Sequence, residues 1–181
     1  SQKGKPMKSE RVHQAMVIDT PPHRLWEILA RYGDVSSFHG GVVRSSSEPG
    51  SKAQASPGCE RVCHIMDMGL NITLKERIVD YEEGKSYAYD VYEWRNFPIR
   101  QMRFGFSIEN PESTRCVLHI DIEFKARPAL LTPLLIPKMR KLAHDVLLGY
   151  KHYAETGEQR APIARLRKTY GRHDHLEVQY G

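Results

Sequence analysis

Hydrophobic and polar residues alternate through most of the stretch between residues 59 and 127, which indicates one β-strand after another. Short segments rich in Gly, Pro, Asn and acidic residues separate these runs, and such segments are typical of turns between antiparallel strands. The predicted strands are Cys59–Met66, Asn71–Tyr81, Lys85–Trp94, Ile99–Ile108 and Arg115–Lys125.

The pattern changes to a helical period after residue 131. From about Thr132 to Glu155 the apolar side chains recur on one helical face, which predicts one long amphipathic helix. Pro137 predicts a kink or a later start near Lys138, and Gly157 is a natural stop. The apolar stripe consists of Leu135, Met139, Leu142, Val146, Tyr150 and Tyr153, widened by Ala143 and Leu147.

The N-terminal part predicts a strand followed by two short helices. Val12–Asp19 alternates in part and is predicted as the first strand. The first helix is expected to begin at Thr20-Pro21-Pro22, with Thr20 capping its free N–H groups, and to end at Gly33. Asp34–Phe38 is expected as a second short helix and Val42–Ser46 as a short strand.

This order of elements predicts an α+β fold in which a curved antiparallel sheet wraps around the C-terminal helix. Such a sheet leaves a cavity between its concave face and the helix, and a cavity implies a guest molecule. Residues 1–10 are expected as a flexible N-terminal tail and 11–158 as the ligand-binding domain. Residues 159–181 are expected as a basic C-terminal tail containing a short helix at Ile163–Lys168.

Composition narrows the class of protein. The chain has 181 residues, 40% hydrophobic and 27% charged, which is ordinary for one globular domain. No apolar run approaches the roughly 18 residues of a membrane span, and the polar start lacks a secretory signal, which predicts a cytoplasmic protein. The net charge is +5, and much of the excess lies near the two ends of the chain. We interpret these ends as solvated tails that bind no specific nucleic acid and contact an anionic membrane only weakly. These features leave the oligomeric state open.

Cysteine usage agrees with a reducing compartment. Cys59 and Cys63 lie on one predicted strand, about 13 Å apart, whereas a disulfide spans less than about 7 Å between Cα atoms. Together with Cys116 they are expected as buried free thiols. The cysteines and histidines do not show the spacing that is typical of a zinc site. His173-Asp174-His175 alone is weak support for a metal site, so no metal and no cofactor are expected.

Several short pieces occur in a characteristic order: Pro21–Trp26, Gly58–Arg61, Leu74–Val79, Tyr87–Val91 and Phe124–Pro128. With them, residues 12–155 resemble the superfamily of polyketide cyclases, START lipid-transfer domains and birch-pollen-type allergens, most of all its bacterial polyketide cyclase/dehydrase-like group. The resemblance implies the helix-grip fold, with a seven-stranded sheet around an apolar tunnel. It leaves two functions open: binding or transport of a lipid or polyketide-like molecule, or aromatase/cyclase or dehydratase chemistry.

The choice of inward-facing residues also depends on resemblance. The two faces of Cys59–Met66 are nearly equal in hydrophobicity, so alternation does not select one. Resemblance to the plant abscisic acid receptors implies that Arg61, Cys63 and Ile65 face inward, and that Glu76 does too. A carboxylate in an apolar cavity must be paired or protonated, and Arg61 on the adjacent strand is the expected partner. The pair is either structural or a catalytic acid–base group.

His39 is the third catalytic candidate beside Glu76 and Arg61. It precedes two glycines, and its position resembles that of the pocket lysine which meets the hormone carboxylate in those receptors. An exposed turn histidine is the alternative. The expected ligand-binding residues are Phe38, His39, Arg61, Cys63, Ile65, Leu74, Glu76, Tyr87, Tyr89, Val91, Met102, Phe104, Met139, Leu142 and Val146.

The last predicted strand has one apolar and one polar face. We expect the apolar face to pack against the helix and the polar face to meet water, because uncompensated polar groups inside would be costly. A catalytic pair of His119 and Asp121 is the less favoured alternative. The apolar face is Leu118, Ile120, Ile122 and Phe124, and the polar face is His119, Asp121 and Glu123.

Overall fold

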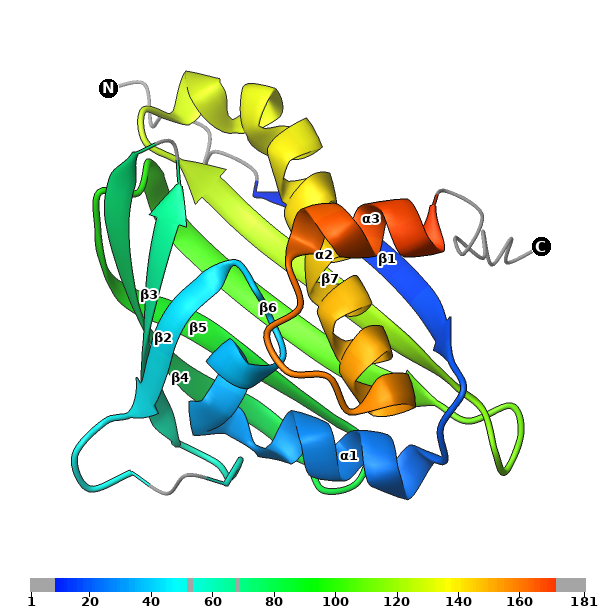
Figure 1. Ribbon diagram of the computed structural model, residues 1–181. Coiled ribbons are helices and arrows are strands. Elements are labelled where there is room, and N and C mark those ends of the chain that lie inside the picture. The colour runs from blue at the N-terminus through cyan, green and yellow to red at the C-terminus, as the bar shows by residue number, and fades with distance from the viewer. Residues whose placement is uncertain (1–8, 52–53, 68, 172–181) are drawn as a thin grey trace.

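The computed structural model describes residues 9–51, 54–67 and 69–171, which form one curved sheet with helices on its concave side (Figure 1). Seven antiparallel strands in this part of the chain lie in the order β1-β7-β6-β5-β4-β3-β2. The helix-grip architecture expected from the sequence is thereby confirmed. The strands are β1 Glu10–Ile18, β2 Val42–Ser47, β3 Glu60–Asp67, β4 Leu70–Glu82, β5 Ser86–Arg95, β6 Ile99–Glu109 and β7 Cys116–Ala126.

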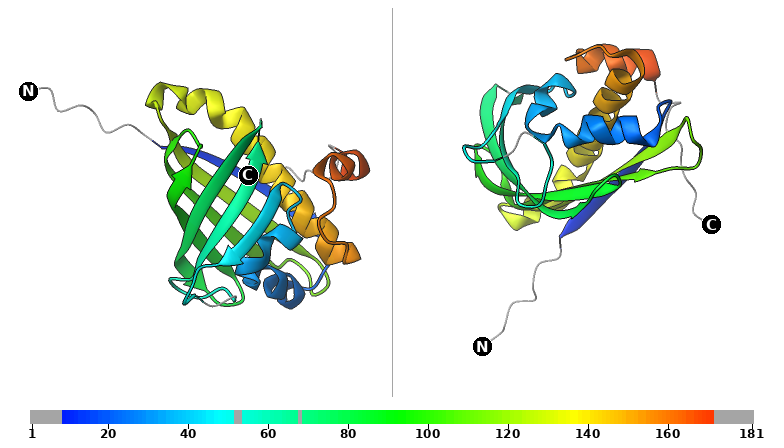
Figure 2. Two further views of the ribbon diagram at one scale, coloured as in Figure 1. Left: turned by 60° about the vertical axis from the view of Figure 1, so that its left-hand side comes forward. Right: turned by 90° about the horizontal axis from the view of Figure 1, so that it is seen from below.

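The long helix α2 runs across the concave face of the sheet, and the two views of Figure 2 show the strands curving around it. Helix α1 lies near the C-terminal end of α2, at one end of the sheet (Figure 1). The helices are α1 Pro22–Ala30, the 3-10 helix η1 Tyr32–Ser37, the 3-10 turn η2 Ala129–Leu131, α2 Thr132–Thr156 and α3 Ile163–Tyr170.

Strand β7 and helix α2 form the centre of the core. The inner face of β7 is completely buried, as the alternation of its residues predicts. On α2, Ala143 and Leu147 are also completely buried, so the helix presents its apolar stripe to the sheet. The buried β7 side chains are Leu118, Ile120, Ile122 and Phe124.

The start of the first helix differs from the prediction. Helix α1 begins at Pro22 with Pro21 as its N-cap, and no side chain caps it. Thr20 is instead buried at the end of β1, where its N–H donates to the Ile18 carbonyl and its own carbonyl accepts from Cys116 Sγ. Thr20 therefore joins β1 to β7 and does not serve as a cap.

Gly33 does not end a helix, contrary to the prediction. Helix α1 ends at Ala30, and Gly33 lies inside η1. A Cβ atom at this position would lie 2.3 Å from Ser47 Oγ, so the glycine allows η1 to approach β2 closely.

Helix α2 begins at Thr132 and continues through Pro137, so the expected later start near Lys138 is wrong. Its end is as predicted: Gly157 has φ 76°, the left-handed conformation that favours glycine after a helix.

Helix α3 packs on the outer side of α2 (Figure 1). Its Leu166 is buried, and its Arg167 forms two hydrogen bonds with Asp145 of α2. Part of the range 159–181, expected as a basic tail, is therefore packed against the domain.

At the other end, β1 begins at Glu10, inside the range expected as a tail. Helices in the described ranges are all too short or too polar to cross a membrane.

Candidate functional site

A cavity of about 640 Å³ lies between the concave face of the sheet and α2. This volume lies within the range of small-molecule binding sites in proteins. Most side chains around it are apolar, and its few polar groups come from β3, β4, the η1–β2 connection, α2 and α3. The apolar part includes Ile65, Ile72, Leu74, Phe97, Met102, Phe104, Phe106, Met139, Leu142, Val146 and Tyr150.

A buried ion pair lies in the wall of the cavity. Arg61 of β3 and Glu76 of β4 are direct partners in the strand register, and both point inward. Arg61 Nε donates to Glu76 Oε2 at 2.6 Å, and Arg61 Nη1 donates to the backbone carbonyl of Tyr32 at 2.9 Å. The guanidinium carbon also lies 4.0 Å from the ring centroid of Tyr32 and 4.6 Å from that of Tyr89. These contacts compensate the buried cation from several sides.

The environment fixes the protonation of the groups around this pair. Burial alone would lower the pKa of Arg61, but the Glu76 carboxylate and the neighbouring thiol and phenols hold it well above its usual value. Burial, followed by the charge of Glu76, raises the pKa of the Cys63 thiol to about 12. Burial likewise raises the pKa of Tyr89 well above its usual value. Near neutral pH the thiol and the phenol therefore stay protonated, which makes them hydrogen-bond donors and poor nucleophiles.

His39 is buried and lines the cavity, so the exposed-turn alternative is wrong. Its Nδ1 accepts a hydrogen bond from the N–H of Gly41 at 3.2 Å. Burial lowers the pKa of His39 to about 4, with Asp145 acting in the opposite direction and Arg61 in the same one. His39 is therefore a neutral imidazole with its proton on Nε2, so it can donate a hydrogen bond to a guest but lacks a free lone pair to act as a base.

Stability should fall on acidification because of His39. Its pKa is about 6.5 in an unfolded chain and about 4 in the folded protein. The unfolded state therefore binds more protons between these values, and a contribution of about 3 kcal/mol, complete above pH 6.5, is lost as the pH falls towards 4. In His39→Gln, which cannot titrate, the free energy of unfolding should fall less over this range. Urea unfolding at pH 7, 5.5 and 4 measures how the free energy of unfolding changes with pH in the wild type and in the variant. The same change in both proteins would contradict the prediction.

Three residues expected in the cavity wall lie elsewhere in the core. Tyr87 shares a strand face with Tyr89, but α1 covers it, and its hydroxyl donates to the Leu29 carbonyl at 3.0 Å. The ring of Phe38 packs against those of Tyr150 and Tyr153. Val91 is buried without reaching the cavity. The other twelve residues expected at the ligand line the cavity: His39, Arg61, Cys63, Ile65, Leu74, Glu76, Tyr89, Met102, Phe104, Met139, Leu142 and Val146.

Sequence reasoning missed a buried tyrosine and several charged residues of the cavity wall, among them Asp67, Lys138 and Lys141. The Tyr32 hydroxyl is buried, and within the described ranges it has no hydrogen-bond partner. Asp145 of α2 and Arg167 of α3 line the cavity as a pair. The polarity of Asp145 in an otherwise apolar part of the last helix was the available signal, whereas nothing in the sequence pairs it with Arg167.

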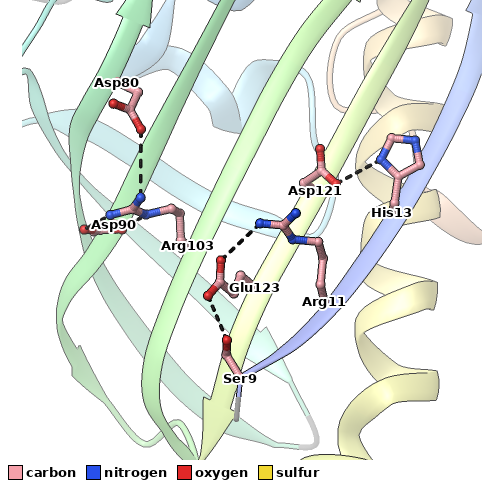
Figure 3. Close-up of polar contacts among 8 residues, drawn as sticks. All are labelled: Ser9, Arg11, His13, Asp80, Asp90, Arg103, Asp121 and Glu123. Atoms are coloured by element: carbon pink, nitrogen blue, oxygen red, sulfur yellow. Dashed lines mark hydrogen bonds and ion pairs between the residues drawn. The ribbon is translucent and has the colours of Figure 1, made fainter.

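The thiols agree with the sequence-based expectations, and the polar face of β7 agrees in part, because His119 is buried whereas Asp121 and Glu123 are partly exposed. Cys59, Cys63 and Cys116 are buried, and none of the three forms a disulfide. His119, Asp121 and Glu123 lie on the convex face, where Figure 3 shows Asp121 beside His13 and Glu123 between Arg11 and Ser9. In the part of the chain that the structure describes, no three His, Cys, Asp or Glu side chains converge as in a metal site. His173-Asp174-His175 lies outside that part.

Residues 9–155 match the family described as polyketide cyclase / dehydrase and lipid transport. No curated protein matches.

Solved structures share the fold at low sequence identity. The crystal structure of Ara h 8.0201 has a TM-score of 0.67 at 13% identity, covering 82% of this chain and 99% of that one. A START superfamily protein from Mycobacterium smegmatis has a TM-score of 0.65 at 10% identity, covering 82% and 98%. The Zhui aromatase/cyclase from Streptomyces sp. R1128 has a TM-score of 0.64 at 14% identity, covering 83% and 98%.

Proposed function

The chain belongs to the polyketide cyclase / dehydrase and lipid transport family, and from this premise we propose that it binds or transports a lipid or polyketide-like molecule in the cavity. The observation that supports this most is the cavity of about 640 Å³ with mainly apolar walls. Removing apolar ligand surface from water is the main driving force for such binding.

The few polar groups indicate how a guest would lie. Two of the five N–H groups of Arg61 already donate, one to Glu76 and one to the Tyr32 carbonyl. The Nε2 proton of His39 and the remaining N–H groups of Arg61 are the donors in the cavity wall that can meet a polar atom of the guest. We therefore propose that a hydroxyl or carbonyl of the ligand lies near His39 and Arg61, with its apolar part towards Met102 and Met139.

Filling the cavity should abolish binding. Val146 of α2 is buried in the cavity wall, and Val146→Trp would place an indole where the guest lies. We expect affinity for an apolar fluorescent dye, and for any lipid captured from cell extract, to fall at least about tenfold because the accessible volume is lost. Dye titration and native mass spectrometry measure the two effects.

The matched control is Leu134→Trp, which adds the same indole to α2 at a side chain that is 71% exposed. This variant should bind as the wild type does. Equal loss in both variants, or dye binding unchanged in a folded Val146→Trp protein, would argue against the cavity as the binding site.

A second candidate function is aromatase/cyclase or dehydratase chemistry on a polyketide-like substrate. The observation in its favour is that Arg61 and Glu76 converge at 2.6 Å inside the cavity, with Cys63 Sγ 3.9 Å from the same carboxylate oxygen. A carboxylate held beside a cationic donor can move a proton to or from a substrate carbon or hydroxyl that lies next to it.

Glu76→Gln separates the two functions. The amide keeps the size of the side chain but cannot accept a proton, so turnover of a polyketide-like substrate should fall by about 100-fold or more, while binding of a non-reacting dye should change little. Product analysis by mass spectrometry and dye titration measure the two. Turnover at the wild-type rate would exclude Glu76 as the acid–base group.

A further inference from the structure

Two histidines meet on the convex face of the sheet, away from the cavity. His13 of β1 lies opposite Asp121 of β7, and Ala15 lies opposite His119, so the two imidazoles are diagonal neighbours. Their ring centroids are 5.3 Å apart, and His13 Nε2 lies 3.3 Å from His119 Nδ1.

The outer nitrogen of each imidazole faces a carboxylate. Figure 3 shows His13 facing Asp121, with His13 Nδ1 2.9 Å from Asp121 Oδ1. His119 Nε2 lies 2.7 Å from Glu109 Oε2 of β6. An ionised carboxylate only accepts hydrogen bonds, so each outer nitrogen carries a proton. In the neutral imidazoles the two inner nitrogens then face each other as lone pairs, and a proton or a metal ion shared between them satisfies both.

We propose that His13 and His119 bind a divalent transition metal of the zinc class, with water completing its coordination. Zinc bonds to imidazole nitrogen at about 2.0–2.1 Å, which places two tetrahedral ligands roughly 3.3 Å apart. The observed separation of the inner nitrogens is 3.3 Å. Histidines that bind metals usually donate their other N–H to a carboxylate, as Asp121 and Glu109 allow here.

The surroundings favour a cation and leave it access. The pair lies beside a hollow of about 770 Å³ on the protein surface, lined by Glu82, Glu83 and Glu109 and by a single ammonium group, that of Lys85. The side chain of His13 is 47% exposed and that of His119 is 10% exposed, so an ion would approach the pair from the side of His13. The excess of negative charge raises the local concentration of cations.

Nothing in the spacing along the chain predicts this pair, because 106 positions separate the two histidines. With only two protein ligands from the described residues, the ion should bind in the micromolar range and exchange freely. A bound ion would join β1, at the edge of the sheet, to β7 beside it, so it should also raise the melting temperature.

Zinc titration of the 181-residue chain tests the proposal. All proteins in this titration carry His173→Asn and His175→Asn, because the two histidines near the C-terminus could otherwise compete for zinc. Calorimetry should show one zinc ion bound per chain, and His13→Asn or His119→Asn should weaken its binding more than about tenfold. His23→Asn, at an exposed histidine on α1, is the matched control and should leave zinc affinity unchanged.

Two results would overturn the proposal. One is zinc affinity that neither His13→Asn nor His119→Asn reduces in folded protein. The other is a shared proton only: nitrogen NMR of the wild-type imidazoles would then show a proton between the inner nitrogens that millimolar zinc does not displace. Because the pair lies outside the cavity, dye binding should be normal in both variants, so failure here is distinguishable from failure of the proposed ligand-binding function.

Discussion

Arg61→Met is expected to cost about 3–5 kcal/mol of folding free energy, because it leaves the Glu76 carboxylate buried without its partner. The two side chains are only 3% and 4% exposed, so water cannot replace the guanidinium. The lost contacts include those with the Tyr32 carbonyl and with the rings of Tyr32 and Tyr89. Native proteins are stable by only roughly 5–15 kcal/mol, so this loss is a large fraction of the total free energy of unfolding. Urea denaturation at pH 7 measures the loss.

Two further variants sharpen this test. Arg77→Met removes an arginine from the same strand pair, but its partner Glu60 is on the solvent side, so stability should change little. The double variant Arg61→Met with Glu76→Leu removes both charges and should be more stable than Arg61→Met alone. If Arg61→Met were as mild as Arg77→Met, the buried pair would not be the main polar restraint on the cavity.

Gly149→Ala is expected to destabilise the protein by about 3 kcal/mol, although Ala usually favours a helix over Gly by about 1 kcal/mol. A Cβ atom at this position of α2 would lie 2.4 Å from the backbone carbonyl oxygen of Phe38. That carbonyl cannot rotate away as a side-chain end could, so α2 and the segment carrying His39 must separate. Thermal and urea unfolding measure the effect, and dye affinity should fall because His39 lines the cavity.

Gly105→Ala is the matched control for steric cost. A Cβ there would lie 3.9 Å from the side chains of Ala88 and Asp121, which is ordinary contact. This variant should retain most of the wild-type stability. If Gly149→Ala were instead as stable as the wild type, the close packing of α2 on Phe38 would not restrain the cavity.

Local chemistry accounts for the parts of the fold that could be predicted. Alternation places the strands within one or two residues of their observed bounds, as at Cys59–Met66 against the observed Glu60–Asp67. The helical period and Gly157 predict α2, with an end at Glu155 against the observed Thr156. These signals are readable because side-chain period and turn preference depend on neighbours in sequence.

The same reasoning fails where a distant segment decides the outcome. Thr20 has the chemistry of a cap, but the end of β1 and Cys116 engage its backbone. Gly33 resembles a helix stop, but it serves a close approach to Ser47. Tyr87 has the strand parity of a cavity residue, but α1 covers it.

The sequence by itself therefore determined the order of strands and helices, the curved sheet around a long helix, and the polar and apolar faces of β7. Resemblance also led us to expect the pairing of Glu76 with Arg61, but only the tertiary structure decided that Asp145 meets Arg167 and that His13 meets His119. The physical reason is that these pairs depend on strand register and on the packing of segments far apart in the chain. Such contacts set the chemistry of the cavity and of the convex face, and no local pattern encodes them.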